Sequence, residues 1–326
     1  MKPIEIGSTF GSVAFVGDAG YIVGGDGSKI RRWRVNDGTE IGQPMAAGNV
    51  VRSIAASRDC KWFVGGTGMS QVAVWNAESG EKVIKFEGHN KPVLAVDISP
   101  DATRIASGSD DGNIRVWSRA TGEQLLGPFK HDFSVVAVKF SPDGQFVATA
   151  TWERNSVRVY DSHDGRLLFD SPIRVGWSCN QSLAWASDSK QLFALSRDGK
   201  VHSLDATDGR ILSAWVIHSN SNPRCIALGS NGAFIAASAD SSVSFWDTTT
   251  HKQIGRRVRC PDVIQFIAIS TNDDLAIGAG KKIILRKLPS NLPSSYFDNV
   301  CVFRSQRDSI YDTRATTDTQ GHPPIG

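Results

Sequence analysis

Residues 88 to 117 read GHNKPVLAVDISPDATRIASGSDDGNIRVW, and this stretch decides the fold. Apolar and polar residues alternate in short runs, which predicts β-strands over Val93–Ile98, Arg104–Gly108 and Ile114–Trp117. A fourth strand is predicted over Glu123–Leu126, after an intervening turn. No run shows the 3.6-residue apolar spacing of a helix. The unit is therefore four short strands in about 42 residues.

The same pattern recurs along the chain at a nearly constant period. Each unit has a β-rich run that ends in a large side chain, and these end positions are Trp33, Trp75, Trp117, Tyr160, Leu204, Trp246 and Arg286. They lie 42, 42, 43, 44, 42 and 40 residues apart. A turn pair follows most of the runs, at Asp37-Gly38, Ser79-Gly80, Thr121-Gly122, Asp164-Gly165 and Asp208-Gly209. Markers that stay in phase in this way predict seven repeats of one unit.

A four-stranded sheet with two apolar faces is not stable alone, so each unit must pack against its neighbours. Closing the row into a ring removes the exposed end sheets, which predicts an all-β, seven-bladed β-propeller of four-stranded antiparallel blades. The seventh unit supplies only three strands before the chain turns at Leu288-Pro289. We expect Pro3–Ile6 to supply its fourth strand, because the connection from there to the first inner strand is short. Cys301–Phe303 is the alternative closing strand.

Residues 88 to 117 resemble a WD repeat from its Gly-His pair to its Trp, and the resemblance extends at declining quality over about residues 10 to 288. It implies a structural hydrogen-bonded relay inside the blade, formed here by His89, Ser107, Asp111 and Trp117. Buried hydroxyl and indole N–H groups need partners, and a carboxylate can hold a histidine in one tautomer. His, Ser and Asp are also the residue types of a catalytic triad. We favour the structural interpretation, because each member has a buried role and no oxyanion site is implied.

The other units depart from this pattern. The fourth keeps His131 and Thr149 but has Glu153 and Tyr160 where the pattern has Asp and Trp. Further departures are Gly65 and Met69 in the second unit, Ala194 and Leu204 in the fifth, and Ala236 in the sixth. Most blades are therefore predicted to be held by apolar packing alone.

Composition and charge exclude several classes of protein. The 326 residues are 40% hydrophobic with a formal charge of +3, as in an ordinary soluble globular protein and far from the basic stripe of a nucleic-acid reader. No apolar run reaches the roughly 20 residues of a membrane span, and the start, MKPIEIGSTF, is no signal peptide. The five cysteines form no CxxC pair, which favours free thiols. We expect a cytoplasmic protein, with the nucleus as the alternative, and no membrane partner.

Motifs for cofactor or metal binding fail on inspection. Gly24–Gly27 and Gly65–Gly68 are rich in glycine, but both are predicted as turns between strands, with no helix to face a phosphate. Gly278–Lys281 resembles a phosphate-binding loop, but Leu275 and Lys282 stand where that loop needs Gly and Ser or Thr. The seven histidines are scattered. We therefore predict no catalytic residue, no cofactor and no metal.

The loops between blades and those between the second and third strands are expected to gather on one rim of the ring. We place a candidate partner surface there, made of Phe133, Trp152, Glu153, Arg154, Trp177, Arg197, Asn222 and Arg224. Aromatic and Arg side chains that are exposed together are typical of interaction hot spots. The alternative is that Trp152 and Trp177 fill space inside the degenerate blades.

The resemblance implies a non-enzymatic scaffold or adaptor that binds other proteins or peptides through this rim. The propeller is assigned to residues 1–288, and residues 289–326 are expected to be a largely disordered tail. One alternative is a propeller enzyme with a pocket in the central channel, which the mostly apolar inner strands disfavour. The other is an RNA-binding propeller that uses the basic clusters Arg31–Arg34 or Arg256–Arg259, which the overall charge disfavours.

Overall fold

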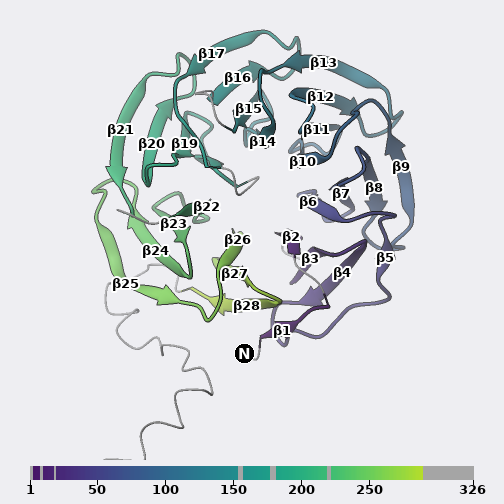
Figure 1. Ribbon diagram of the computed structural model, residues 1–326, viewed down its shortest axis with the longest axis horizontal. Coiled ribbons are helices and arrows are strands. Elements are labelled where there is room, and N and C mark those ends of the chain that lie inside the picture. Colours follow the sequence, from purple (N-terminus) through teal and green to yellow (C-terminus); the bar gives the residue numbers. More distant parts are fainter. Residues whose placement is uncertain are drawn as a thin grey trace, which may run out of the picture.

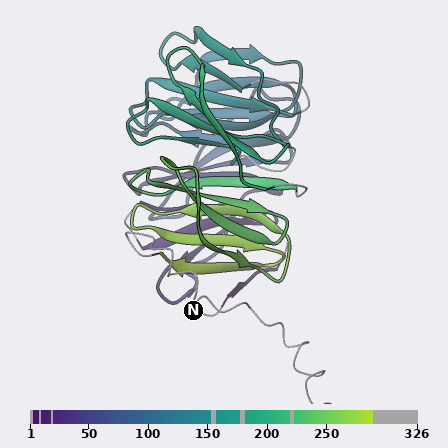
Figure 2. The same cartoon turned by 90° about the vertical axis from the view of Figure 1, so that its left-hand side faces the viewer.

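The computed structural model describes residues 3–7, 10–17, 20–152, 157–176, 181–218 and 222–288. Every regular element in these ranges is a β-strand, and the strands form seven four-stranded antiparallel sheets. Figure 1 shows the sheets as blades around a central axis. Figure 2 shows the same ring from its side. The predicted seven-bladed β-propeller is confirmed.

In each of the first six blades, the strands follow one another in chain order from the axis outward. Blade one contains β2 (Phe10–Phe15), β3 (Tyr21–Asp26), β4 (Lys29–Arg34) and β5 (Met45–Ala46). Blade two contains β6 (Val51–Ala56), β7 (Trp62–Thr67), β8 (Val72–Asn76) and β9 (Lys82–Phe86). Blade three contains β10 (Val93–Ile98), β11 (Arg104–Ser109), β12 (Asn113–Ser118) and β13 (Gln124–Lys130).

The second half of the chain repeats this arrangement. Blade four contains β14 (Val135–Phe140), β15 (Phe146–Thr151), β16 (Val157–Asp161) and β17 (Leu167–Ser171). Blade five contains β18 (Leu183–Trp185), β19 (Gln191–Leu195), β20 (Lys200–Asp205) and β21 (Ile211–Val216). Blade six contains β22 (Pro223–Leu228), β23 (Phe234–Ala239), β24 (Ser242–Asp247) and β25 (Gln253–Arg259).

Blade seven joins the two ends of the chain. It contains β26 (Ile264–Ile269), β27 (Asp274–Ala279), β28 (Lys282–Lys287) and, as the outer strand, β1 (Ile4–Glu5). Ile4 pairs with Ile283 and Glu5 with Lys282, and Glu5 Oε1 lies 3.0 Å from Lys282 Nζ. The N-terminal strand therefore closes the ring, as predicted. The alternative segment, Cys301–Phe303, lies outside the described residues.

The outer strand of blade three runs further than the sequence predicted. It continues to Lys130 because the pairing with β12 shifts between Val116↔Leu126 and Ile114↔Phe129. Gly127, with φ +87°, lies at this shift. A positive φ is available to glycine at little cost, so the strand can bulge here and resume pairing.

Neighbouring blades approach closely where a glycine of one faces a valine of the next. A Cβ added at Gly66 would lie 2.6 Å from Val93 Cγ1, and one added at Gly108 would lie 2.5 Å from Val135 Cγ1. Gly25 and Val51 make the same contact between blades one and two. Residues 24–26 belong to β3 and residues 65–67 belong to β7. This corrects the prediction that these glycine-rich stretches are turns. Their glycines serve blade packing.

One rim of the ring is built by hydrogen bonds between the linkers that join blades and the hairpins that join second and third strands. We call it the linker rim. Asp110 N donates to Pro92 O at 2.9 Å, and Trp152 N donates to Ser134 O at 3.0 Å. Arg197 N donates to Arg174 O at 2.7 Å in the same way. These bonds fix the exposed loops of the rim to the rigid blades.

Candidate interaction surface

The structure brings the four relay residues of blade three together. Trp117 Nε1 donates to Ser107 Oγ at 2.8 Å, and Ser107 Oγ lies 2.8 Å from His89 Nε2. His89 Nδ1 lies 2.9 Å from Asp111 Oδ2. The indole can only donate, so the Ser107 hydroxyl donates a hydrogen bond to His89 Nε2, and His89 Nδ1–H donates to Asp111 Oδ2. The histidine and carboxylate side chains are only 1% and 3% exposed.

The carboxylate of Asp111 is held in its charged form. Burial alone would raise its pKa, but hydrogen bonds from His89 and from the backbone N–H groups of Asn113 and Asn90 lower it to about 2. The Ser107 hydroxyl is fully buried and occupied on both sides, so it is not placed to attack a substrate. The geometry is that of a structural network.

Blade four has a weaker version of this network. His131 Nε2 lies 3.2 Å from Tyr160 Oη and 3.5 Å from Thr149 Oγ1. Its Nδ1 is buried without a hydrogen-bond partner among the described residues, and Glu153 lies outside them. Burial lowers the pKa of His131 to about 4, with a further contribution from Arg158. The imidazole of His131 is therefore neutral at pH 7.

Blade six rebuilds the network from a different position. His218 Nε2 lies 3.2 Å from Ser244 Oγ, which also accepts Trp246 Nε1–H at 2.8 Å. Ser244 pairs across the strands with Ala237, and Ala237 occupies the place that Ser107 has in blade three. Counting along the sequence had put Ala236 there. The hydroxyl stands on the facing strand, whereas the repeat pattern in the sequence marks only the strand that carries Ala237.

Blade five connects similar residue types in another order. Ser196 Oγ lies 2.5 Å from Asp198 Oδ1 and 3.2 Å from His202 Nε2. The Ser196 hydroxyl donates its hydrogen bond to Asp198 Oδ1 or to Lys200 O, because these oxygens can only accept. His202 Nε2 must therefore be the donor in its contact with Ser196 Oγ. Burial, the largest influence, lowers the pKa of His202.

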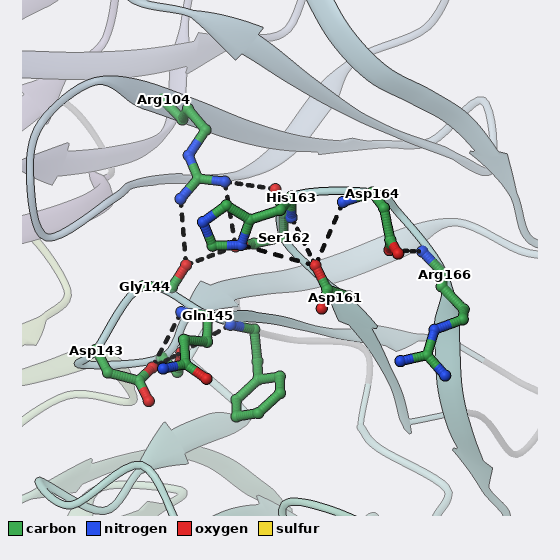
Figure 3. A network of polar contacts seen from close by, with 11 residues as sticks. Arg104, Asp143, Gly144, Gln145, Asp161, Ser162, His163, Asp164 and Arg166 are labelled. Atoms are coloured by element: carbon green, nitrogen blue, oxygen red, sulfur yellow. Dashed lines mark hydrogen bonds and ion pairs between the residues drawn. The ribbon is translucent and has the colours of Figure 1, made fainter.

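A second polar network lies at the rim opposite the linker rim and joins blades three and four. Figure 3 shows Arg104 directed at Ser162 and Gly144 of the next blade. Its guanidinium donates to Ser162 Oγ at 3.1 Å and to Gly144 O at 3.2 Å. His163 lies beside Ser162, but the Ser162 hydroxyl is buried and donates to Gly144 O. This network fastens two blades together.

The predicted partner surface is only partly within the described residues. Arg197 and Asn222 are exposed, and Phe133 and Arg224 are half-buried. Trp152 is half-buried and packs against the apolar core of blades four and five, as the packing alternative expects. Glu153, Arg154 and Trp177 lie outside the described residues.

A crevice of about 650 Å³ opens beside Arg197, between blades four and five. Its walls are Pro172–Val175 of the linker after β17, Ser196–Asp198 of the β19–β20 hairpin, His202 and Ile211. Ile173 and Val175 point into the protein, whereas Arg174 and Arg197 are exposed. Asp198, the carboxylate in this lining, already lies 2.9 Å from Lys200 Nζ. The crevice therefore combines two exposed arginines, the ion-paired carboxylate of Asp198 and apolar groups.

The central channel holds a smaller hollow of about 270 Å³, lined mostly by apolar residues of the inner strands. Its charged lining residues are Asp97 and Lys139, whose Oδ1 and Nζ atoms lie 3.6 Å apart. Asp97 Oδ2 also accepts the backbone N–H of Phe140. No group of three or more potential metal-ligating side chains occurs within the described part of the chain.

The basic clusters differ in how they are used. Arg31 contacts Asp26 at 2.8 Å and Glu40 at 2.5 Å, so its charge is neutralised inside blade one. Arg256, Arg257 and Arg259 are exposed along β25. Charged side chains on an outer strand oppose pairing with other sheets.

The repeats match a known family. The family model for "WD domain, G-beta repeat" (WD40) matches residues 80–118, 123–161 and 209–247. Each match begins just before the outer strand of one blade and ends at the third strand of the next blade. The chain thus carries WD40 repeats at three positions within its seven-bladed β-propeller. Proteins of this family generally serve as protein-interaction scaffolds and typically lack catalysis.

A search of curated proteins gives no match to the chain. The described ranges contain no helix that is both long and apolar enough to cross a membrane.

Proposed function

We propose that this propeller is a non-enzymatic scaffold that binds segments of other proteins at the linker rim of blades four and five. The observation that carries the proposal is the crevice of about 650 Å³, with Arg174 and Arg197 exposed at its mouth. Ligand-binding pockets are concave and largely apolar, with a few polar groups that set orientation, and arginine is enriched at the hot spots of protein interfaces.

The backbone around this crevice is suited to hold a fixed binding geometry. Val175 bridges Trp152 on one side and Ser196 on the other, so the linker lies between the ends of two blades as an extra extended segment. The hydrogen bond from Arg197 N to Arg174 O holds the two exposed arginines on neighbouring segments. A preformed site loses less entropy on binding than one that must order first.

The test is site-specific photocrosslinking with the full chain. A photoreactive residue at position 197 should crosslink a partner protein, whereas the same residue at Lys190 should not. Lys190 is a matched control, because it is an exposed cationic residue of the same blade, between β18 and β19, and neither it nor its neighbours line the crevice. Arg197→Glu should abolish capture. Equal crosslinking from both positions would refute the rim of blades four and five as the site.

We also propose a reducing compartment, the cytoplasm, as the place where this scaffold acts. Cys60, Cys225 and Cys260 are free thiols, and Cys225 and Cys260 are buried. Burial raises the pKa of Cys260 to about 11, so this thiol is protonated and unreactive at pH 7. Localisation of a tagged chain by microscopy tests this placement.

A further inference from the structure

The outer strands of the blades are sheet edges, and one of the longer ones differs from the others. The other long outer strands expose charged side chains, namely Lys82 and Lys85 in β9, Lys130 in β13, Asp170 in β17, and Arg256, Arg257 and Arg259 in β25. In contrast, β21 reads ILSAWV and carries no charge. Its exposed positions are Ile211, Leu212, Ala214 and Val216, and all four are apolar. Such an edge lacks the usual protection against pairing with another strand.

The backbone of β21 also offers free pairing positions. Ile217 N donates to Gly199 O, so the inward-facing positions of this strand are 217, 215 and 213. The N–H and C=O groups of Ala214 and Val216 therefore point away from the blade. No strand of the described residues lies outside β21. These groups are available for a further antiparallel or parallel neighbour.

The strand is held firmly enough to serve as a template. Trp215 is 8% exposed and lies in the core shared by blades five and six. Its ring stacks on His251 of the next blade with centroids 4.2 Å apart, and meets Phe193 edge-on at 6.3 Å. The edge is thus anchored by its one buried side chain, while its neighbours face solvent.

We propose that β21 pairs antiparallel with β21 of a second copy of this chain, so that two blades become one eight-stranded sheet. A two-fold axis at Ala214 places Leu212 opposite Val216 of the other copy. It uses the outward-facing backbone groups of both strands. The small Ala214 side chains meet at the axis, and no like charges are brought together. The equivalent pairing of two β25 strands would oppose arginine to arginine.

Self-complementarity selects a second copy over other occupants. A strand that is apolar and uncharged is matched by a strand of the same kind, and its own copy supplies one at equal concentration. Two-fold pairing uses β21 of each molecule, and among the described residues the other outer strands of five or more residues are charged. The assembly therefore closes at two copies and does not extend into a fibre. The pairing is centred on Ala214, whereas the exposed arginines of the crevice lie on the linker after β17 and on the β19–β20 hairpin, and β21 contributes only Ile211 to the crevice wall.

Sedimentation of the full chain over a wide concentration range tests the proposal. The chain should pass reversibly from monomer to dimer as concentration rises. Leu212→Lys and Val216→Lys should each raise the dissociation constant at least about tenfold. Val83→Lys, at an exposed position of the outer strand β9, is the matched control and should leave it unchanged. Unchanged thermal unfolding of the monomers shows that the variants fold.

Hydrogen exchange supplies a second readout. The amides of Ala214 and Val216 should exchange more slowly at high protein concentration, whereas those of Val83 should not respond. The proposal is overturned by a monomer at every concentration, by assemblies larger than two copies, or by a dimer that Leu212→Lys and Val216→Lys leave intact. Equal weakening by Val83→Lys also overturns it, because the contact would then not be specific to β21.

Discussion

Blades three and six both bury polar side chains, but they connect them in different hydrogen-bond networks. Both bury a histidine, a serine hydroxyl and a tryptophan indole in one chain of contacts. Blade three adds Asp111, which binds His89 Nδ1, whereas His218 Nδ1 of blade six has no hydrogen-bond partner among the described residues. The hydroxyl can therefore sit on either of two paired strands, but only the carboxylate completes the network.

The difference also separates the two blades in their response to pH. The Asp111 pKa is lowered to about 2, while burial and Arg257 lower the pKa of His218 to about 4. Blade three thus keeps a charged group inside the protein and blade six keeps a neutral one. A blade with the carboxylate is expected to be the more rigid of the two.

The largest expected effect is a loss of stability in mild acid that arises outside blade three. The pKa values of His131 and His218 fall from the ordinary 6.5 to about 4 in the folded chain. Between these values the unfolded chain binds more protons than the folded chain, so stability falls as the pH falls from 6.5 to 4. At pH 4 the loss is on the order of 3 kcal/mol for each histidine, and so about 6 kcal/mol for the pair.

Histidine NMR resonances measured against pH check this prediction directly. The rings of His131 and His218 should remain neutral at pH 5, and unfolding by denaturant should need less denaturant there than at pH 7. Titration of both rings near their ordinary pKa would show that neither is held neutral by burial.

The second effect comes from removing the charge that completes blade three. Asp111→Asn should lower the free energy of unfolding at pH 7 by about 2 kcal/mol, because the folded carboxylate is stabilised relative to the unfolded one. In the wild type this contribution is present above the ordinary pKa of 3.8 and is lost as the pH falls toward 2. The variant should therefore lose this acid-dependent part. Denaturant titrations at several pH values measure both, and an unchanged stability at pH 7 would contradict the role given to Asp111.

A smaller effect is expected from the hydroxyl of blade six. Ser244→Ala should cost about 1 kcal/mol, since Trp246 Nε1 and His218 Nε2 lose their shared partner. Adding Ala237→Ser puts a hydroxyl at the facing position, where Ser107 stands in blade three, and should restore most of the loss. Chemical denaturation of the single and double variants measures this exchange. A double variant no more stable than Ser244→Ala would show that the two positions are not equivalent.

The smallest effect is expected at the hairpin of blade six. Asp240→Asn is the matched control for Asp111→Asn, and asparagine accepts the φ of +50° found at this position. Because blade six does not use this carboxylate in its network, the change should stay within about 0.5 kcal/mol. A loss as large as that of Asp111→Asn, measured under the same conditions, would remove the distinction between the blades.

The ring could be predicted from the sequence because its signals are local and repeated. Strand alternation, turn pairs and the spacing from Trp33 to Arg286 each report short-range geometry, and seven copies reinforce one another. The closing strand followed from counting three strands in the last unit. The complete relay of blade three was also readable, since its residues match the repeat position by position.

The networks of the degenerate blades could not be read in this way, because they depend on register. Ser244 faces Ala237 only once β23 and β24 are paired, and no periodic pattern marks that pair. The crevice beside Arg197 likewise depends on the linker Pro172–Val175, whose path is set by bridges to Trp152 and Ser196. For Trp152, the sequence offered both an exposed position and packing inside a degenerate blade, and the structure packs it against the core of blades four and five.

Closure of the ring is the claim on which the scaffold depends, and a designed disulfide tests it most directly. Glu5 and Lys282 are opposite each other on β1 and β28, so Glu5→Cys with Lys282→Cys should form a cross-strand disulfide under mild oxidation. Peptide mapping by mass spectrometry should find residue 5 joined to residue 282, with raised thermal stability. A bond from residue 282 to the native Cys301, with residue 5 left free, would place the C-terminal segment at the edge of blade seven and contradict closure by the N-terminal strand.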